Sequence, residues 1–306
     1  MTRIKLIGAA GLAFAAVTAL PAAPAGGTSH IVYRCGPGFS NLCRIDPTGG
    51  AVTQLTRDGK PRGPVYAEPS YSRDGKRMTY TFGNDLYVAR GDATHRRLLE
   101  RRVVLDRLSP DGKWVTLAKI LPDPVGGPCP GFICVGRSIP YLFIRPAGPG
   151  KLETVARAVA TVGWWRDRLM IDQQKSLEEG QSICVLRINT DFHCARDVAV
   201  DPIRDLWGPA GSPNGRYIAA AAAPRPGPNE TTTKLDGYIA LYSPGTAQLV
   251  RNLTHGQHDS YPTWSPDGSL IAFNRGSSIY VIHADGSDAG RPRLLVRSGI
   301  QPTWGA

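Results

Sequence analysis

The chain has 306 residues, including 35 glycines and 26 prolines spread along its length, and a formal net charge of +11. This length accommodates one large all-β domain or two ordinary domains. The frequent glycine and proline argue against a mainly helical protein, because they suit short strands joined by tight turns.

Residues 1–25 have the pattern of a signal peptide. Arg3 and Lys5 precede an apolar run from Leu6 to Leu20, and Ala23-Pro24-Ala25 supplies the small residues of a cleavage site. The run is shorter than the roughly 20 residues that span a bilayer, which favours a cleaved signal over a retained membrane anchor. We therefore expect an exported protein, periplasmic or secreted, with no stable membrane insertion after cleavage. The mature chain, residues 26–306, keeps 34 Lys and Arg against 25 Asp and Glu, a charge of +9.

The mature chain begins with three predicted strands and continues with a repeated motif. The strands are His30–Tyr33, Leu42–Asp46 and Val52–Thr56. The clearest copy of the motif is Pro262–Gly268 (PTWSPDG), which leads into the apolar run Leu270–Phe273. The other copies are Pro69–Gly75, Leu108–Gly112, Trp164–Asp167, Pro209–Gly215 and Pro302–Gly305.

The chemistry of Ser-Pro-Asp-Gly predicts a hairpin turn at each full copy. Serine favours the first position of a type I turn, proline presets φ at the second, and glycine accepts a left-handed conformation. The predicted turn residues are Asp74, Gly75, Asp111, Gly112, Asn214, Gly215, Asp267 and Gly268.

Each turn joins the first two strands of a four-stranded unit. After Leu270–Phe273 come Ser278–His283 and Arg293–Val296, which complete the unit that begins near Asp259. Gly75 and Gly112 are 37 residues apart, as are Gly268 and Gly305, close to the ~40 residues of a propeller blade. We predict an all-β, six-bladed β-propeller of four-stranded antiparallel blades. Pro302–Trp304 would close the ring by joining the three N-terminal strands in one blade, which hides sheet edges.

The pattern from Asp259 to Ser287, DxxPxWSPDGxxIAF followed by IYVxxxDGS, resembles the TolB-like, WD40-like (PD40) β-propeller repeat. The resemblance covers essentially all of residues 28–306. It implies a binding scaffold, and we expect a bacterial source. No Gly-x-Ser-x-Gly elbow or HExxH motif occurs, and the chain ends where the ring closes, so we expect no hydrolase domain.

Export predicts that the six cysteines form disulfides, because thiols in an oxidising compartment tend to pair. Six cysteines allow 15 pairings. Close spacing favours Cys35 with Cys43, Cys129 with Cys134, and Cys184 with Cys194. No CxxC spacing with further ligands in reach is present, so we expect neither a metal nor another cofactor.

In an up-and-down blade, the loops between the second and third strands lie on the same face of the ring as the junctions between blades. We call this face the rim. Its predicted long loops are Cys35–Cys43, Leu121–Ser138 and Ala223–Asp236. Long loops gathered on one face suit a binding surface, although exposed loops also tolerate neutral changes in length.

Two groups of candidate binding residues fall in blade junctions on the rim. Arg57, Lys60 and Arg62 follow the first blade, where they suit either an acidic partner or a solvated loop. His255, His258 and Asp259 precede the last blade, where they suit metal binding or proton transfer, or a plain structural role within the repeat.

Two functional hypotheses follow. The first is a non-catalytic scaffold that binds a protein or an anionic envelope polymer through the rim and the central channel. The alternative is a carbohydrate- or peptide-active hydrolase or lyase that uses His255, His258 and Asp259 at the channel mouth. Export and the lack of an aromatic-basic motif argue against nucleic acid as a partner, and we favour a monomer.

Overall fold

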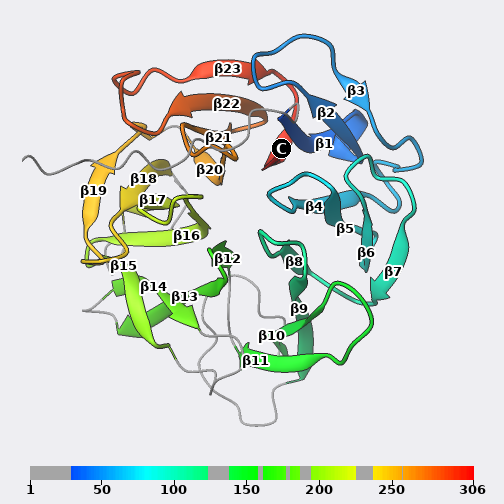
Figure 1. Cartoon of the computed structure of the whole chain (residues 1–306), viewed down its shortest axis with the longest axis horizontal. Helices are drawn as coiled ribbons and strands as arrows, with labels where there is room; N and C mark the ends of the chain where they lie inside the picture. Colours follow the sequence, from blue (N-terminus) through cyan, green and yellow to red (C-terminus); the bar gives the residue numbers. More distant parts are fainter. Residues whose placement is uncertain are drawn as a thin grey trace, which may run out of the picture.

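The computed structural model describes residues 29–122, 138–157, 161–176, 180–186, 194–224, 237–256 and 258–306. Six four-stranded antiparallel sheets stand around a central axis as blades (Figure 1). The predicted six-bladed β-propeller is therefore confirmed.

Each blade is ordered from an innermost strand at the axis to an outermost strand at the periphery. Blade 1 consists of β24 (Ile300–Gly305), β1 (His30–Cys35), β2 (Asn41–Ile45) and β3 (Thr53–Gln54), with the 3-10 turn η1 (Pro37–Phe39) between β1 and β2. Blade 2 consists of β4 (Tyr66–Tyr71), β5 (Arg77–Phe82), β6 (Asp85–Arg90) and β7 (Arg97–Glu100). Blade 3 consists of β8 (Leu105–Leu108), β9 (Trp114–Pro122), β10 (Ser138–Pro146) and β11 (Glu153–Arg157).

The remaining blades follow the same order. Blade 4 consists of β12 (Val162–Trp165), β13 (Arg168–Ser176), β14 (Gly180–Leu186) and β15 (Arg196–Asp201). Blade 5 consists of β16 (Arg204–Gly211), β17 (Ile218–Pro224), β18 (Tyr238–Tyr242) and β19 (Leu249–Asn252). Blade 6 consists of β20 (Asp259–Trp264), β21 (Leu270–Arg275), β22 (Ser278–His283) and β23 (Arg293–Val296).

Blade 1 closes the ring as predicted. The C-terminal strand β24 pairs antiparallel with the N-terminal strand β1, with Ile31 opposite Trp304. The innermost strand of this blade thus comes from one end of the described chain and its three partners from the other end.

The repeated turns share one hydrogen-bond pattern. In each, the serine Oγ donates to the Asp or Asn Oδ1 at 2.5–2.9 Å and accepts the N–H of the residue five positions on. The fourth residue donates its N–H to the serine carbonyl and has a positive φ of 64–77°. A side chain at this φ would be strained, which explains the recurring glycine. The residues are Gly75, Gly112, Gly215 and Gly268.

The outermost strand of blade 1 is shorter than the predicted Val52–Thr56. The N–H groups of Leu55 and Thr56 share the carbonyl of Leu42, at 2.8 and 3.3 Å. The N–H of Leu42 donates instead to the Thr56 hydroxyl at 2.9 Å. This side-chain bond replaces a ladder bond and ends the regular pairing at Gln54. Leu253 and Thr254 repeat the arrangement against Ile239 in blade 5.

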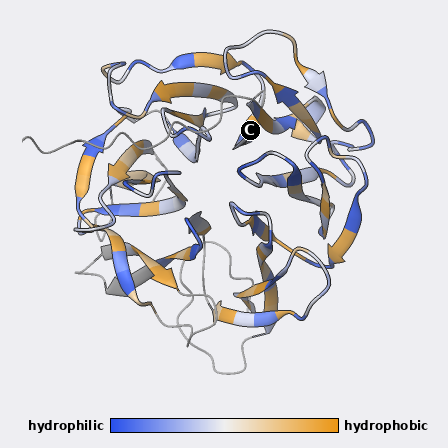
Figure 2. Ribbon diagram, viewed as in Figure 1, coloured by the Kyte–Doolittle hydropathy of each residue, from blue (hydrophilic) through white to orange (hydrophobic). Residues whose placement is uncertain are grey.

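The hydrophobic core lies between successive blades. One cluster joins Val32 and Leu42 of blade 1 to Tyr66, Met78 and Tyr80 of blade 2. Another joins blade 5 to blade 6 through Ile239, Trp264 and Phe273. Hydrophobic residues accordingly recur along the strands (Figure 2). Each blade is buried on both faces, which explains why the strand sequences are short apolar runs.

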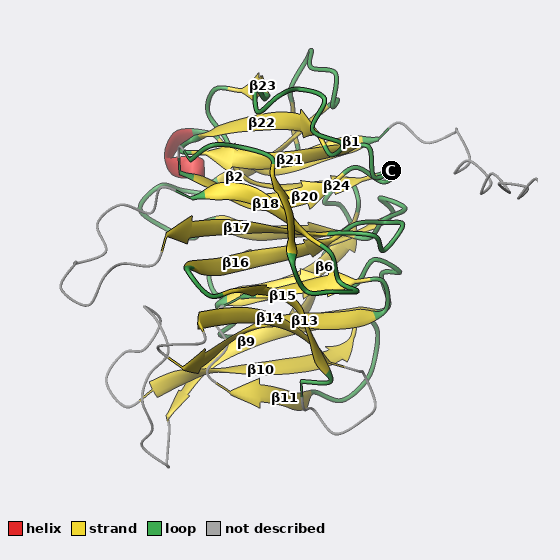
Figure 3. Cartoon of the chain, turned by 90° about the vertical axis from the view of Figure 1, so that its left-hand side faces the viewer, coloured by secondary structure: helices red, strands yellow, loops and turns green. Residues whose placement is uncertain are grey.

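The two faces of the ring differ in their loops. The connection β1–β2 with η1 and the described junctions between blades lie on the rim, at the left in Figure 3. Two further predicted loops follow β9 and β17, the second strands of blades 3 and 5. The Ser-x-Asp-Gly turns lie on the opposite side, which we call the turn face. The predicted long loops therefore fall between second and third strands, although residues 123–137 and 225–236 lie outside the described chain.

Candidate functional site

The junction after blade 1 presents three cations on an ordered loop. Arg57, Lys60 and Arg62 are exposed, and their side chains form no ion pair or hydrogen bond with any described residue. The intervening Asp58 instead accepts a hydrogen bond from the Tyr66 hydroxyl at 2.7 Å. Asp58 also forms an ion pair with Arg96 at 3.5 Å. The acidic side chain of the loop is thus engaged by blade 2, whereas its three basic side chains face solvent.

Asn41 holds this basic loop in place. Its side-chain amide accepts a hydrogen bond from the Gly59 N–H at 3.1 Å and donates to the Gly59 carbonyl at 3.4 Å. A Cβ on Gly59 would stand 1.8 Å from the Ser40 carbonyl oxygen, so only glycine fits. Lys60 closes a tight turn, because its carbonyl accepts the Gly63 N–H at 3.0 Å. The loop is preordered, which lowers the entropic cost of binding.

A disulfide loop supports the basic loop from the side. Cys35 and Cys43 form a disulfide with a Cα–Cα distance of 5.8 Å and enclose η1. A Cβ on Gly38 would lie 3.0 Å from the Pro61 Cβ, so the two loops are in close contact. The rim of blade 1 is therefore one connected surface.

This surface continues to the rim end of the central channel. Arg34 donates to the Phe39 carbonyl at 2.9 Å and to the Gln301 side chain at 3.4 Å. Gln301 in turn donates to the Glu68 carboxylate, which also accepts a bond from Arg107. These four side chains come from blades 1, 2 and 3 and connect their innermost strands around the mouth.

Three residues at this mouth have strained backbones. Glu68, Tyr261 and Gln301 have φ of 49°, 52° and 53°, and each precedes a proline at a β-bulge of an innermost strand. Such conformations cost of order 1–3 kcal/mol and cluster at binding sites. These three positions were not predicted from the sequence. The signal for them was that each directly precedes the first proline of a repeat copy. All three residues line the central channel, at the bulges in the innermost strands of blades 1, 2 and 6.

The structure places His255, His258 and Asp259 in two different environments. Asp259 is fully buried, and its two carboxylate oxygens accept bonds from Arg275 at 2.7 and 2.9 Å. His255 and His258 line a separate cleft with Arg204 and Tyr238, formed by blade 5 and the junction that follows it. Among the described residues, no three His, Cys, Asp or Glu side chains are grouped to hold a metal. The carboxylate of Asp259 is therefore held in an ion pair rather than exposed at the cleft.

The cysteines were predicted to pair with their neighbours, and two such pairs are present. Besides Cys35–Cys43, Cys184 bonds to Cys194 across the hairpin of blade 4. Cys129 and Cys134 lie outside the described residues. No helix in the described parts of the chain is long and apolar enough to cross a membrane.

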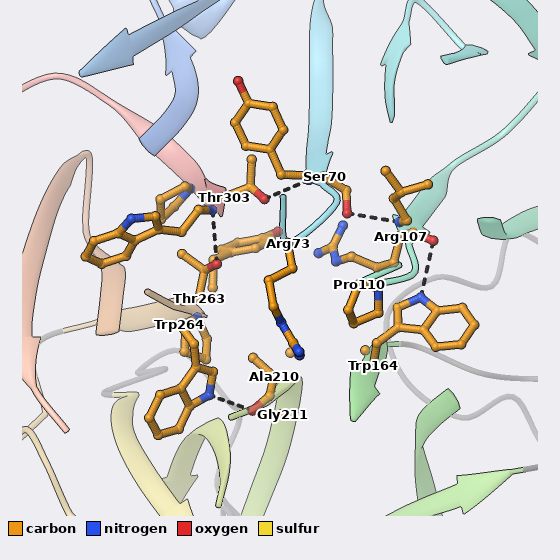
Figure 4. Close-up of a pocket in the computed structure, with 18 of the residues that line it drawn as sticks. Ser70, Arg73, Arg107, Pro110, Trp164, Ala210, Gly211, Thr263, Trp264 and Thr303 are labelled. Atoms are coloured by element: carbon orange, nitrogen blue, oxygen red, sulfur yellow. Dashed lines mark hydrogen bonds between the residues drawn. The ribbon is translucent and has the colours of Figure 1, made fainter. Parts of the chain in front are cut away.

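The central channel is bounded by the innermost strands of all six blades (Figure 4). Solved structures share this arrangement. TolB from Acinetobacter baumannii has a TM-score of 0.66 and 13% identity over 91% of this chain and 67% of that chain. A putative TolB from Agrobacterium tumefaciens has a TM-score of 0.59 and 15% identity over 89% of each chain. The fold is that of a TolB-like propeller.

The same fold occurs in proteins of other kinds. An oligogalacturonate lyase in complex with manganese has a TM-score of 0.54 and 14% identity, over 88% of this chain and 78% of that chain. A chain of a nidogen/laminin complex has a TM-score of 0.61 and 9% identity, over 90% of this chain and 98% of that chain. No family model matches the sequence. No curated protein matches it either. These identities show the shared fold alone.

Proposed function

We propose that this chain is an exported, non-catalytic scaffold that binds an acidic protein on the rim of blade 1. The observation that carries the proposal is the basic loop. Arg57, Lys60 and Arg62 are held ready on a rigid turn, and they have no partner among the described residues. An ordered cluster of exposed cations favours an anionic partner and speeds its association.

Further features support each part of the proposal. The apolar run at residues 6–20 and the small residues at 23–25 suit a cleaved signal, and the two disulfides suit an oxidising compartment. TolB-like neighbours and the nidogen/laminin chain share the propeller. The buried ion pair of Asp259 favours a scaffold over the hydrolase or lyase hypothesis, because that carboxylate faces Arg275.

The test is affinity capture from a bacterial envelope extract with the mature chain as bait. The variant Arg57→Ser/Lys60→Ser/Arg62→Ser removes the three rim cations. The control Lys76→Ser/Lys113→Ser/Lys151→Ser removes three exposed lysines from the turn face. A captured protein is then purified, and its affinity for each variant is measured by titration calorimetry.

We expect a protein that binds the wild type and the control alike, loses at least about ten-fold in affinity for the rim variant, and dissociates at high salt. Protease-resistant capture of a polysaccharide would instead assign an anionic polymer to the rim. Turnover of oligogalacturonate or of a peptide by the purified chain would contradict the non-catalytic function.

A further inference from the structure

Arg73 stands where the other turns have proline. It is the second residue of the Ser72–Gly75 turn, and the equivalent residues are Pro110, Pro213 and Pro266. Proline presets the φ that this position needs, so arginine forgoes that advantage. The backbone is nevertheless fixed on both sides. The Arg73 N–H donates to the Pro110 carbonyl at 2.8 Å, and its carbonyl accepts the Ala306 N–H at 3.0 Å. A rigid frame thus carries a long cationic side chain.

This side chain extends into the central channel (Figure 4). Arg73 remains accessible to solvent, and its guanidinium forms no hydrogen bond or ion pair within the described part of the chain. The desolvating walls lower the pKa of Arg73, which still leaves it charged at neutral pH. Arg107, at the rim end of the same channel, is neutralised by Glu68. Arg73 is therefore an uncompensated positive charge in a confined space.

Most other polar groups of the channel wall are already engaged by the ring. The hydroxyls of Ser70, Thr263 and Thr303 accept backbone N–H groups of the adjacent blades at 2.9–3.2 Å. The indoles of Trp164 and Trp264 donate to carbonyls of neighbouring blades at 3.4 and 2.9 Å. The remaining wall is rich in proline, which has no N–H to offer.

These features define what the channel can hold. A sugar polymer needs hydrogen-bond partners for many hydroxyls, and leaving buried hydroxyls unpaired costs affinity. A peptide tail needs one strong site for its terminal carboxylate and apolar walls for its side chains. The guanidinium offers two parallel N–H donors that match a carboxylate.

We propose that the central channel binds the C-terminal carboxylate of a peptide that enters from the turn face, with Arg73 as the carboxylate partner. The tryptophan and proline walls contact the preceding residues of the peptide. This site lies at the opposite end of the channel from the basic loop, so it goes beyond the rim function and does not depend on it.

The test uses a fluorescein-labelled random hexapeptide library in two forms, one with free C-terminal carboxylates and one with C-terminal carboxamides. Each form is passed over the immobilised mature chain, and retained peptides are sequenced and titrated by fluorescence anisotropy. We expect the carboxylate form to be retained and the carboxamide form to bind at least about ten-fold more weakly, as the loss of a charged hydrogen bond predicts.

Three variants locate the effect. Arg73→Gln should abolish the preference for carboxylate, and Arg73→Lys should keep part of it because the charge remains. Lys76→Gln, an exposed cation on the same turn, should leave binding unchanged. Equal thermal unfolding of all three confirms an intact ring. Equal retention of both library forms, retention of neither, or unchanged binding by Arg73→Gln would overturn the proposal. Arg73-dependent binding of tetragalacturonate without peptide binding would overturn it in favour of an acidic sugar.

Discussion

The Thr303 hydroxyl of the C-terminal strand accepts a hydrogen bond from the Tyr71 N–H of blade 2, at 3.1 Å. β24 also pairs with β1 of its own blade, and the Trp304 N–H donates to the Thr263 hydroxyl of blade 6 at 3.2 Å, so the last strand binds both neighbouring blades. Deletion of Gln301–Ala306 should therefore destabilise the whole propeller rather than fray one end. We expect one cooperative thermal transition lowered by more than about 10 °C, or no folded protein. An unchanged transition would contradict ring closure.

A milder substitution isolates the Thr303 bond. Thr303→Val keeps the side-chain shape but leaves the Tyr71 N–H without its partner, which should cost about 1–3 kcal/mol of unfolding free energy. Thr53→Val, at an exposed position of β3, is the matched control and should change stability by less than about 0.5 kcal/mol. Urea denaturation measures both. Equal effects would show that the Thr303 bond contributes nothing.

The ion pair of Asp259 and Arg275 should contribute strongly to stability. Removing one partner of a buried pair leaves an uncompensated charge, which typically costs about 3–5 kcal/mol. Arg275→Met should therefore destabilise the protein strongly. Asp259→Asn combined with Arg275→Met should recover much of that loss, because no buried charge remains. If Asp259→Asn instead removed an enzymatic turnover while stability stayed unchanged, the carboxylate would have a catalytic role.

The repeat made the ring predictable, and the exceptions to the repeat did not follow from it. Ser-x-Asp-Gly fixes a turn through local bonds, so the blade count and the bounds of β22 and β23 could be read directly. The bond from Gln301 to Glu68 joins blades that meet only after ring closure, and Arg107 then binds the same carboxylate. Arg73 was visible as a departure from proline, but its place in the channel required the assembled ring.

Asp106 makes stability depend on pH. It is fully buried on β8, neither carboxylate oxygen has a hydrogen-bond partner among the described residues, and burial raises its pKa to about 8. The unfolded chain ionises near the ordinary value of about 3.9, so from there to about pH 8 the folded state holds the extra proton. The contribution of Asp106 to stability is therefore full at low pH and is lost as pH rises, at up to about 1.4 kcal/mol per pH unit.

Asp106→Asn should remove this slope. We expect the variant to gain stability relative to wild type as pH rises from 5 to 8, measured by urea denaturation at each pH. His30, whose pKa is lowered by burial, contributes a slope of opposite sign. That contribution is common to both proteins and cancels in the difference. A difference between the proteins that does not vary with pH would show that Asp106 is ionised in the folded state.

The rim disulfide should control the order of the basic loop. Cys35→Ala/Cys43→Ala removes a disulfide that joins cysteines eight positions apart. In the chain-entropy treatment, losing this cross-link lowers the unfolding free energy by about 2–3 kcal/mol. Because Gly38 packs on Pro61, the loss should also release the loop of residues 57–64. We expect faster amide exchange at Gly59 and Gly63 and weaker binding of the acidic partner. Cys184→Ala/Cys194→Ala, in blade 4, is the control that should leave exchange in this loop unchanged. If both double variants accelerated it equally, the effect would reflect global stability, and preordering of the basic loop by the disulfide would be refuted.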